Sequence, residues 1–154
     1  MTLGRIFLRY YLPVLLWLLL MAIFSTGQFS GGFTFRVLSA VAHVFYPDVS
    51  EEFLRWLHAL LRKGAHVGEY FVFALLQWRA LRREAAARWR GSWAVITAAL
   101  GVLLAGADEL HQARTPGRTG SVVDVGWDLL GVALALLWIY WHARRARAGV
   151  QLSG

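Results

Sequence analysis

Long apolar stretches alternate with short polar segments along this chain. A helix needs about 20 mainly apolar residues to cross a bilayer. The pattern predicts four spans, at about residues 6–24, 64–81, 91–110 and 121–142. Arg9 and Pro13 interrupt the first span, and the third carries no charged residue as far as Ala107. The expected fold is therefore all-α and integral to the membrane, a four-transmembrane-helix bundle forming a single domain over residues 1–154.

The first span also has features of a signal peptide. Arg5 and Arg9 form a basic start, and an apolar core follows them. No small-x-small cleavage site ends this core, because Ala22 is followed by Ile23 and Phe24. We therefore expect a retained membrane anchor.

The segment between the first two spans, about residues 27–63, is long and ends in a predicted amphipathic helix. Its start is loosened by three glycines, Gly27, Gly31 and Gly32. Asp48 and Glu51 have the spacing of a capping box. Apolar residues then recur at helical spacing, namely Phe53, Leu54, Trp56, Leu57, Leu60 and Leu61. We expect this helix to lie on the outer membrane surface and to lead into the second span.

Composition narrows the class of protein. Hydrophobic residues make up 58% of the chain and charged residues 16%, against about 25% charged in a soluble domain. This excludes a soluble enzyme and a disordered tail. The absence of cysteine excludes a disulfide scaffold, a zinc–thiolate site and a Cys nucleophile. The net charge of +7 does not indicate nucleic acid, because the arginines flank the apolar runs instead of forming one basic face.

The basic residues predict the orientation of the bundle. With the N-terminus inside, ten lie in cytoplasmic segments: Arg5, Arg9, Arg79, Arg82, Arg83, Arg88, Arg90, Arg144, Arg145 and Arg147. Six lie outside: Arg36, Arg55, Arg62, Lys63, Arg114 and Arg118. Because Lys and Arg concentrate on the cytoplasmic side, we expect both termini inside.

In this orientation the polar residues of spans two to four gather at the outer end. They are Lys63, His66, Glu69 and Tyr70, then Asp108, Glu109, His111 and Gln112, then Ser121, Asp124 and Asp128. Small residues lie below them at helical spacing, Ala98, Gly101 and Ala105 on span three, and Gly131 and Ala135 on span four. Small residues let membrane helices approach closely. We therefore expect spans three and four to pack together beneath a polar cluster, whose ionisable residues indicate a functional site.

Two of these carboxylates, Asp124 and Asp128, lie four residues apart, where like charges repel. Protonation, a cation or a basic partner would relieve the repulsion, and the basic partners are Lys63, Arg114, Arg118 and His66. Arg118 and the free N–H groups at the start of span four could also hold a phosphate or a carboxylate.

Simpler structural roles stay open for the same residues. The alternatives are a capping box of Ser121 with Asp124, a local hydrogen bond of His66 with Glu69, and a salt bridge of Asp108 with Arg118. A divalent metal is a further alternative, with ligands from His66, Glu69, Asp108, Glu109, Asp124 and Asp128. No His-Glu-x-x-His spacing is present, so no cofactor is predicted.

Two segments resemble the signatures of the VanZ-like family. Residues 62–70 contain a Lys-x-x-His-x-x-Glu-Tyr pattern that begins at Lys63. The Asp-Glu-Leu-His-Gln run at residues 108–112, with Pro-Gly-Arg at 116–118 and Ser-Val-Val-Asp at 121–124, resembles the second signature. Asp128 is a departure, because the family usually has Asn there. The resemblance implies a small bacterial multi-spanning membrane protein with no settled reaction or substrate. The family's namesake is associated with resistance to the glycopeptide teicoplanin.

Together these features predict a multi-pass protein of the bacterial cytoplasmic (inner) membrane, with an outer pocket for an anionic or polar envelope ligand. The ligand would be a lipid headgroup or a lipid-linked cell-wall precursor. The expected binding residues are Lys63, His66, Glu69, Tyr70, Asp108, Glu109, Gln112, Arg118, Ser121, Asp124 and Asp128.

Three other functions stay open. One is a membrane enzyme that modifies an envelope lipid, with His66, Glu69 and Asp108 as catalytic candidates. A transporter is disfavoured because the charge lies in one layer at the outer end, although a homodimer could supply a pathway. A scaffold would use the polar cluster only to fix helix packing.

Overall fold

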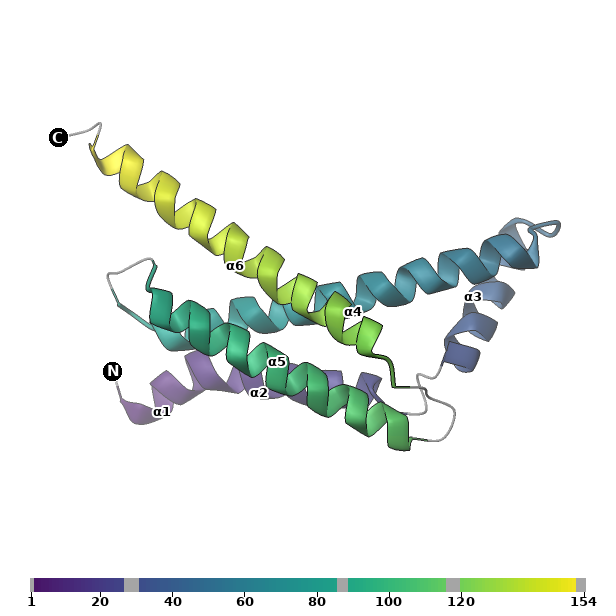
Figure 1. The fold of residues 1–154 in the computed structure, drawn as a ribbon, viewed down its shortest axis with the longest axis horizontal. Helices are drawn as coiled ribbons and strands as arrows, with labels where there is room; N and C mark the ends of the chain where they lie inside the picture. Colours follow the sequence, from purple (N-terminus) through teal and green to yellow (C-terminus); the bar gives the residue numbers. More distant parts are fainter. Residues whose placement is uncertain (1, 27–30, 86–88, 116–119, 152–154) are drawn as a thin grey trace.

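The computed structural model describes residues 2–26, 31–85, 89–115 and 120–151. Its N-terminal helix consists of α1 (Leu3–Ile6), a π-helical turn η1 (Phe7–Tyr11) and α2 (Leu12–Phe24). The remaining helices are α3 (Gly31–Phe45), α4 (Glu51–Arg82), α5 (Gly91–Arg114) and α6 (Val122–Gln151) (Figure 1). None of the described residues lies in a strand, so the predicted all-α class is confirmed over them.

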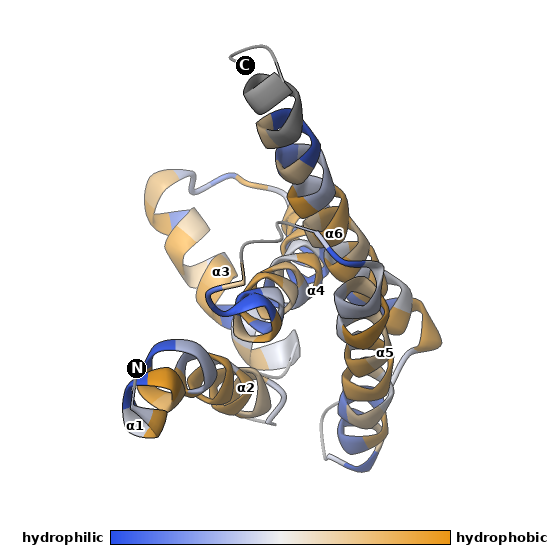
Figure 2. Ribbon diagram, turned by 90° about the vertical axis from the view of Figure 1, so that its left-hand side faces the viewer, coloured by the Kyte–Doolittle hydropathy of each residue, from blue (hydrophilic) through white to orange (hydrophobic). Residues whose placement is uncertain are grey.

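Among the described residues, three helical stretches are long and apolar enough to cross a membrane: Leu3–Phe24, Gly91–Arg114 and Val122–Ala146. They correspond to the predicted first, third and fourth spans. Their outer faces are apolar, and Leu15, Leu103 and Leu137 are between 50% and 69% exposed (Figure 2). A soluble monomer rarely exposes apolar faces of this extent, so the helices indicate a membrane protein.

The predicted second span is not a separate helix. It forms the C-terminal half of α4, and the predicted amphipathic helix forms the N-terminal half of the same 32-residue helix. At 1.5 Å per residue this helix is about 48 Å long. Charged residues along α4 set it apart from the three apolar stretches, so a fourth crossing remains a prediction. The N-cap of α4 is Ser50, whose hydroxyl accepts a hydrogen bond from Phe53 N–H at 3.2 Å; the predicted cap at Asp48 was wrong.

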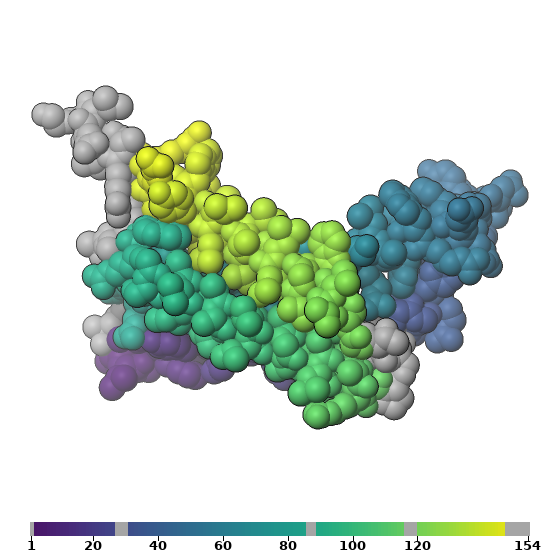
Figure 3. Space-filling view, viewed as in Figure 1, coloured from purple at the N-terminus to yellow at the C-terminus, as the bar shows by residue number. Residues whose placement is uncertain are grey.

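A helix that the sequence analysis did not predict, α3, lies against the N-terminal half of α4. Thr34 Oγ1 and His58 Nε2 are 2.8 Å apart, and the rings of Phe35 and His58 meet edge to face at 5.6 Å. Together α3 and the start of α4 project from the rest of the molecule (Figure 3). The segment after the first span was expected to begin without regular structure, but it is helical from Gly31 onward.

The pattern of backbone hydrogen bonds in the first span changes just before a proline. Pro13 lies in the first turn of α2 and has no N–H to donate to the preceding turn. The π-helical turn η1 immediately before α2 accommodates this missing bond. The span thus stays helical from Leu3 to Phe24.

Small residues allow the helices to approach closely, as predicted. Ala105 of α5 and Ala135 of α6 are fully buried, and a Cβ on Gly101 would lie 2.8 Å from Val132. Spans three and four therefore pack together. Gly131, however, faces α4, where a Cβ would collide with the carbonyl oxygen of Val67, so the small face of α6 serves both neighbouring helices.

The start of the first span, the end of α4, the start of α5 and the C-terminal part of α6 lie at one end of the bundle (Figure 1). Contacts across this end join the first span to α4, including Arg9 with Glu84 at 3.7 Å and Arg79 over the ring of Tyr10 at 5.6 Å. This end also holds an aromatic cluster made of Trp78, Trp89, Trp93 and Tyr140. Trp78 and Trp93 are buried, so they pack the helices together at this end.

Candidate functional site

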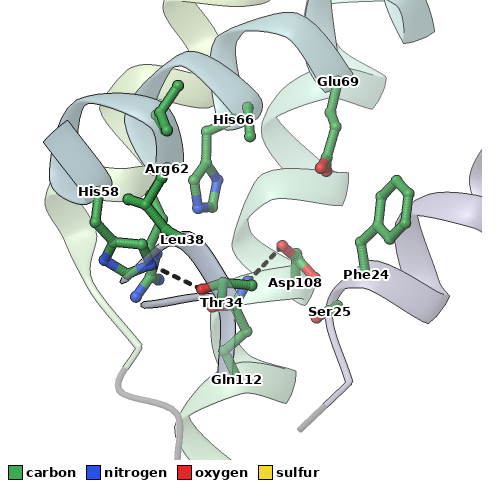
Figure 4. A pocket seen from close by; sticks show the side chains of 12 residues that line it. Phe24, Ser25, Thr34, Leu38, His58, Arg62, His66, Glu69, Asp108 and Gln112 are labelled. Atoms are coloured by element: carbon green, nitrogen blue, oxygen red, sulfur yellow. Dashed lines mark hydrogen bonds between the residues drawn. The ribbon is translucent and has the colours of Figure 1, made fainter. Parts of the chain in front are cut away.

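A cavity of about 330 Å³ lies toward the other end, between helices α2 to α5 (Figure 4). Its apolar lining is Phe24, Leu38, Leu61 and Ala65. Its polar lining is Ser25, Thr34, His58, Arg62, His66, Glu69, Asp108 and Gln112. Ligand-binding pockets start at about 300 Å³ and combine apolar walls with a few polar groups, so this cavity has the size and lining of a small-ligand site.

One face of α4 supplies much of this lining. His58, Arg62 and Glu69 lie on it with Ala65, at intervals of three and four residues. The sequence analysis missed His58 and Arg62, because it treated the amphipathic helix and the second span as separate elements. Their signal was present, since the same spacing continues through both segments once α4 is taken as one helix.

His58 joins the cavity to α3. Its Nε2 is 2.8 Å from the hydroxyl of Thr34, which also lines the cavity. Burial, followed by the neighbouring positive charge of Arg62, lowers the pKa of His58 below its ordinary value of 6.5. The ring is therefore neutral at neutral pH, and Arg62 is the charged cation of this part of the lining.

The side opposite α4 comes from α5 and the end of α2 (Figure 4). Asp108 Oδ2 accepts a hydrogen bond of 2.8 Å from Gln112 Nε2, and Gln112 is fully buried. Trp17 of α2 donates from Nε1 to the backbone oxygen of Glu69 at 3.0 Å. These bonds fix the lining residues on three different helices.

His66 is held from beneath the cavity by α6. Its Nδ1 lies 2.8 Å from Oδ1 of Asp128, which has no exposed surface. The sequence left two kinds of partner open for His66, namely Glu69 and the Asp124–Asp128 pair, and the contact that the structure shows is with Asp128. The contact joins two helices, so the spacing of residues along one helix could not decide which partner His66 has.

Glu109 of α5 binds the start of α6. Its Oε2 accepts a hydrogen bond of 2.5 Å from the N–H of Ser121, the residue before α6. Negative charge is favoured at a helix N-terminus. The carbonyl of Ser121 accepts the N–H of Asp124 at 2.9 Å, whereas the predicted side-chain capping box between these two residues stays a prediction.

Several predicted site residues lie elsewhere. Lys63 is exposed, with its Nζ 5.3 Å from the ring centre of Trp127, and it does not line the cavity. Tyr70 is buried in the core beside Phe73. Ser121 and Asp124 are half-buried at the start of α6 and also lie outside the cavity lining. Arg118, and with it the predicted salt bridge to Asp108, lies outside the described residues.

Three apolar helices of spanning length beside a cavity of mixed lining define an α-helical membrane protein with a ligand-sized pocket. Within this class the chain belongs to the VanZ/LLP1 family, whose model matches residues 7–144, nearly the whole chain. The match confirms the resemblance drawn from residues 62–70 and 108–124. No curated protein and no solved structure matches the chain.

Proposed function

We propose that this protein resides in the bacterial cytoplasmic membrane and binds a polar or anionic envelope ligand in its cavity. The ligand would be a lipid headgroup or the head of a lipid-linked cell-wall precursor. The observation that carries this proposal is the mixed lining of the 330 Å³ cavity, in which Phe24 and Leu38 accompany Arg62, Asp108 and Glu69. Such a lining suits an amphiphile whose head is polar and whose chain is apolar.

The proposed topology has four crossings with both termini in the cytoplasm. The first span, α4, α5 and α6 run alternately between the two ends of the bundle (Figure 1). The end opposite the cavity carries Arg79, Arg83 and Arg144, and such residues favour the cytoplasmic side. The cavity would then open toward the extracytoplasmic leaflet.

The polar lining suggests the chemistry of the headgroup. Arg62 presents a guanidinium, which binds phosphate through paired N–H donors. Asp108 and Glu69 present carboxylate oxygens, which accept hydrogen bonds from hydroxyl or amino groups. A phosphate that carries a sugar or an amino alcohol would satisfy both kinds of group.

Native mass spectrometry of the detergent-purified protein tests this proposal. Ala65→Phe places a large side chain in the cavity lining, and Ala59→Phe places the same side chain on an exposed part of α4 outside it. We expect a defined lipid adduct on the wild type and on Ala59→Phe, and its loss in folded Ala65→Phe. Equal adducts on all three proteins would show that lipid binds elsewhere.

We also propose that binding of this ligand contributes to glycopeptide resistance. If the ligand is a lipid-linked cell-wall precursor, expression in a susceptible bacterium should raise the inhibitory concentration of teicoplanin. Asp108→Asn, which removes a cavity carboxylate charge, should abolish the increase, and Glu52→Gln on the exposed start of α4 should retain it. If bacteria that express the wild-type protein in the membrane stay as susceptible to teicoplanin as before, the protein does not confer resistance, whatever ligand it binds.

A second candidate function is modification of an envelope lipid. The observation that favours it is the His66–Asp128 contact, because a carboxylate that orients an imidazole beside a cavity is an arrangement used in acid–base catalysis. Its test is the lipid profile of cells that express the wild type or His66→Asn. A lipid product present only with the wild type would establish turnover, and identical profiles would exclude it under those conditions.

A further inference from the structure

Three metal-binding side chains converge beneath the cavity, each from a different helix. They are His66 of α4, Glu109 of α5 and Asp128 of α6. One nitrogen or oxygen atom from each lies within 4.8 Å of the corresponding atoms of the other two. Residues separated by up to 62 positions are therefore brought to one point.

The two carboxylates each leave one oxygen without a partner. Glu109 is 7% exposed and Asp128 is 0% exposed. Glu109 uses Oε2 to bind the N–H of Ser121, and Asp128 uses Oδ1 to bind His66. Among the described residues, neither Glu109 Oε1 nor Asp128 Oδ2 has a hydrogen-bond partner, although both are buried. Buried polar atoms are almost always satisfied, so these two oxygens indicate a missing ligand.

The charge around the three side chains indicates that this ligand is a cation. Within the part of the chain that the structure describes, neither carboxylate forms a salt bridge to Lys or Arg. Protonation of His66 would offset only one of the two negative charges. Asp108 and Asp124 add negative potential nearby, because both act electrostatically on Glu109 and Asp128. A divalent cation would balance the pair of carboxylates and occupy both free oxygens.

We propose that His66, Glu109 and Asp128 bind a divalent transition-metal ion, either zinc or manganese. One imidazole nitrogen with two carboxylate oxygens is a donor set that both ions accept, whereas magnesium and calcium prefer oxygen ligands alone. Ligand atoms at about 2.0–2.2 Å from zinc lie about 3.0–3.6 Å from one another. The three groups already lie within 4.8 Å of one another, so small shifts admit the ion, with His66 Nδ1 and Asp128 Oδ1 moving apart from their present 2.8 Å.

This inference goes beyond headgroup binding and does not depend on it. Because His66 also lines the cavity, the ion would lie at the cavity floor, next to whatever occupies the cavity. The chemistry that the ion supplies there is that of a Lewis acid. The test below measures metal and stability and requires no knowledge of the cavity ligand.

The experiment uses the full chain, purified in detergent after removal of any histidine tag, since such a tag would itself bind metal. Elemental analysis by inductively coupled plasma mass spectrometry measures metal per chain in the wild type, Asp128→Asn and Glu109→Gln. Both variants keep the shape of the side chain and remove its charge. Glu52→Gln, at an exposed acid on α4, is the matched control.

We expect one zinc or manganese ion per wild-type chain and per Glu52→Gln chain, and a large loss of metal in the two buried-site variants. After treatment with a chelator, adding zinc or manganese should restore the ion and raise the unfolding temperature of the wild type by several degrees. If either variant fails to fold, this measurement on the wild type still tests the proposal.

Two outcomes would overturn the proposal. The first is wild-type protein that holds no metal and does not change its unfolding temperature when zinc or manganese is added. The second is equal metal in the wild type and both folded variants, which would mark adventitious binding.

Discussion

The close contact between α4 and α6 at Gly131 gives a quantitative prediction. A Cβ at this position would collide with the carbonyl oxygen of Val67 and lie 3.0 Å from Phe71 N. Both are backbone atoms, so no side chain can rotate away. Gly131→Ala therefore requires the two helices to separate locally by about 1 Å to restore an ordinary contact.

The cost follows from two opposing contributions. Overpacking costs about 1–3 kcal/mol, and a collision with rigid backbone belongs at the upper end of this range. Alanine is a better helix former than glycine by about 1 kcal/mol. The free energy of unfolding should therefore fall by about 2 kcal/mol, which lowers the unfolding temperature by about 4–8 °C for a chain of this size.

The same separation should affect the site. Gly131 follows Asp128 by three residues on α6, and Val67 follows His66 directly on α4. An opening of about 1 Å would lengthen the 2.8 Å contact between His66 and Asp128 beyond hydrogen-bond range. Loss of stability and loss of this hydrogen bond should therefore occur together in Gly131→Ala.

The assay is thermal unfolding followed by tryptophan emission, since the chain contains eight tryptophans and no cysteine for a thiol-reactive dye. Gly126→Ala is the matched control, because a Cβ on Gly126 meets nothing within 4 Å on the same helix. It should unfold at the wild-type temperature or slightly above it. If Gly131→Ala is as stable as Gly126→Ala, the backbone contact between α4 and α6 does not exist.

Three further predictions concern pH, an interhelical hydrogen bond and topology. Because the pKa of His58 is lowered below 6.5 on folding, the unfolded chain binds more protons as the pH falls through that value. As the pH is lowered from about 7.5 to about 5.5, the protection of α3 against hydrogen exchange, taken relative to the intrinsic rate at each pH, should therefore fall, and His58→Gln should remove this dependence. Trp17→Phe loses the bond to the Glu69 carbonyl and should lower the unfolding free energy by about 1 kcal/mol, which a thermal melt in detergent measures; an unchanged melt would dismiss this bond. In intact cells, a membrane-impermeant maleimide should label Asp48→Cys and spare Glu84→Cys, whereas the opposite labelling would reverse the proposed orientation.

The buried faces of α5 and α6 could be predicted from the sequence because the residues of each face lie on a single helix. Ala105 and Gln112 recur at helical spacing on α5, as do Asp128 and Ala135 on α6, and all four are buried. Helical period alone determines which residues share a face. It therefore also predicted correctly that small residues would bring spans three and four together.

The pairing of side chains across helices could not be predicted in the same way. His66 was as compatible with Glu69 as with Asp128, because contacts between helices depend on their rotation and depth. The bond from Ser121 to Glu109 likewise depends on how α5 and α6 meet. The helix α3 was missed because its glycines at residues 31 and 32 indicate weak helix propensity, whereas packing on α4 compensates for it.

The unbroken course of α4 joins the cavity lining to the bundle core. The helix carries His58 and Arg62 in its N-terminal half, and it contributes Tyr70 and Phe73 to the bundle core further along. The structure shows no break between these parts, so tilting one half tilts the other as a lever. Spanning helices adjust to bilayer thickness by tilting. In the proposed four-crossing topology, the width of the cavity mouth would therefore depend on the thickness of the surrounding bilayer, and lipid chain length would control access to the site.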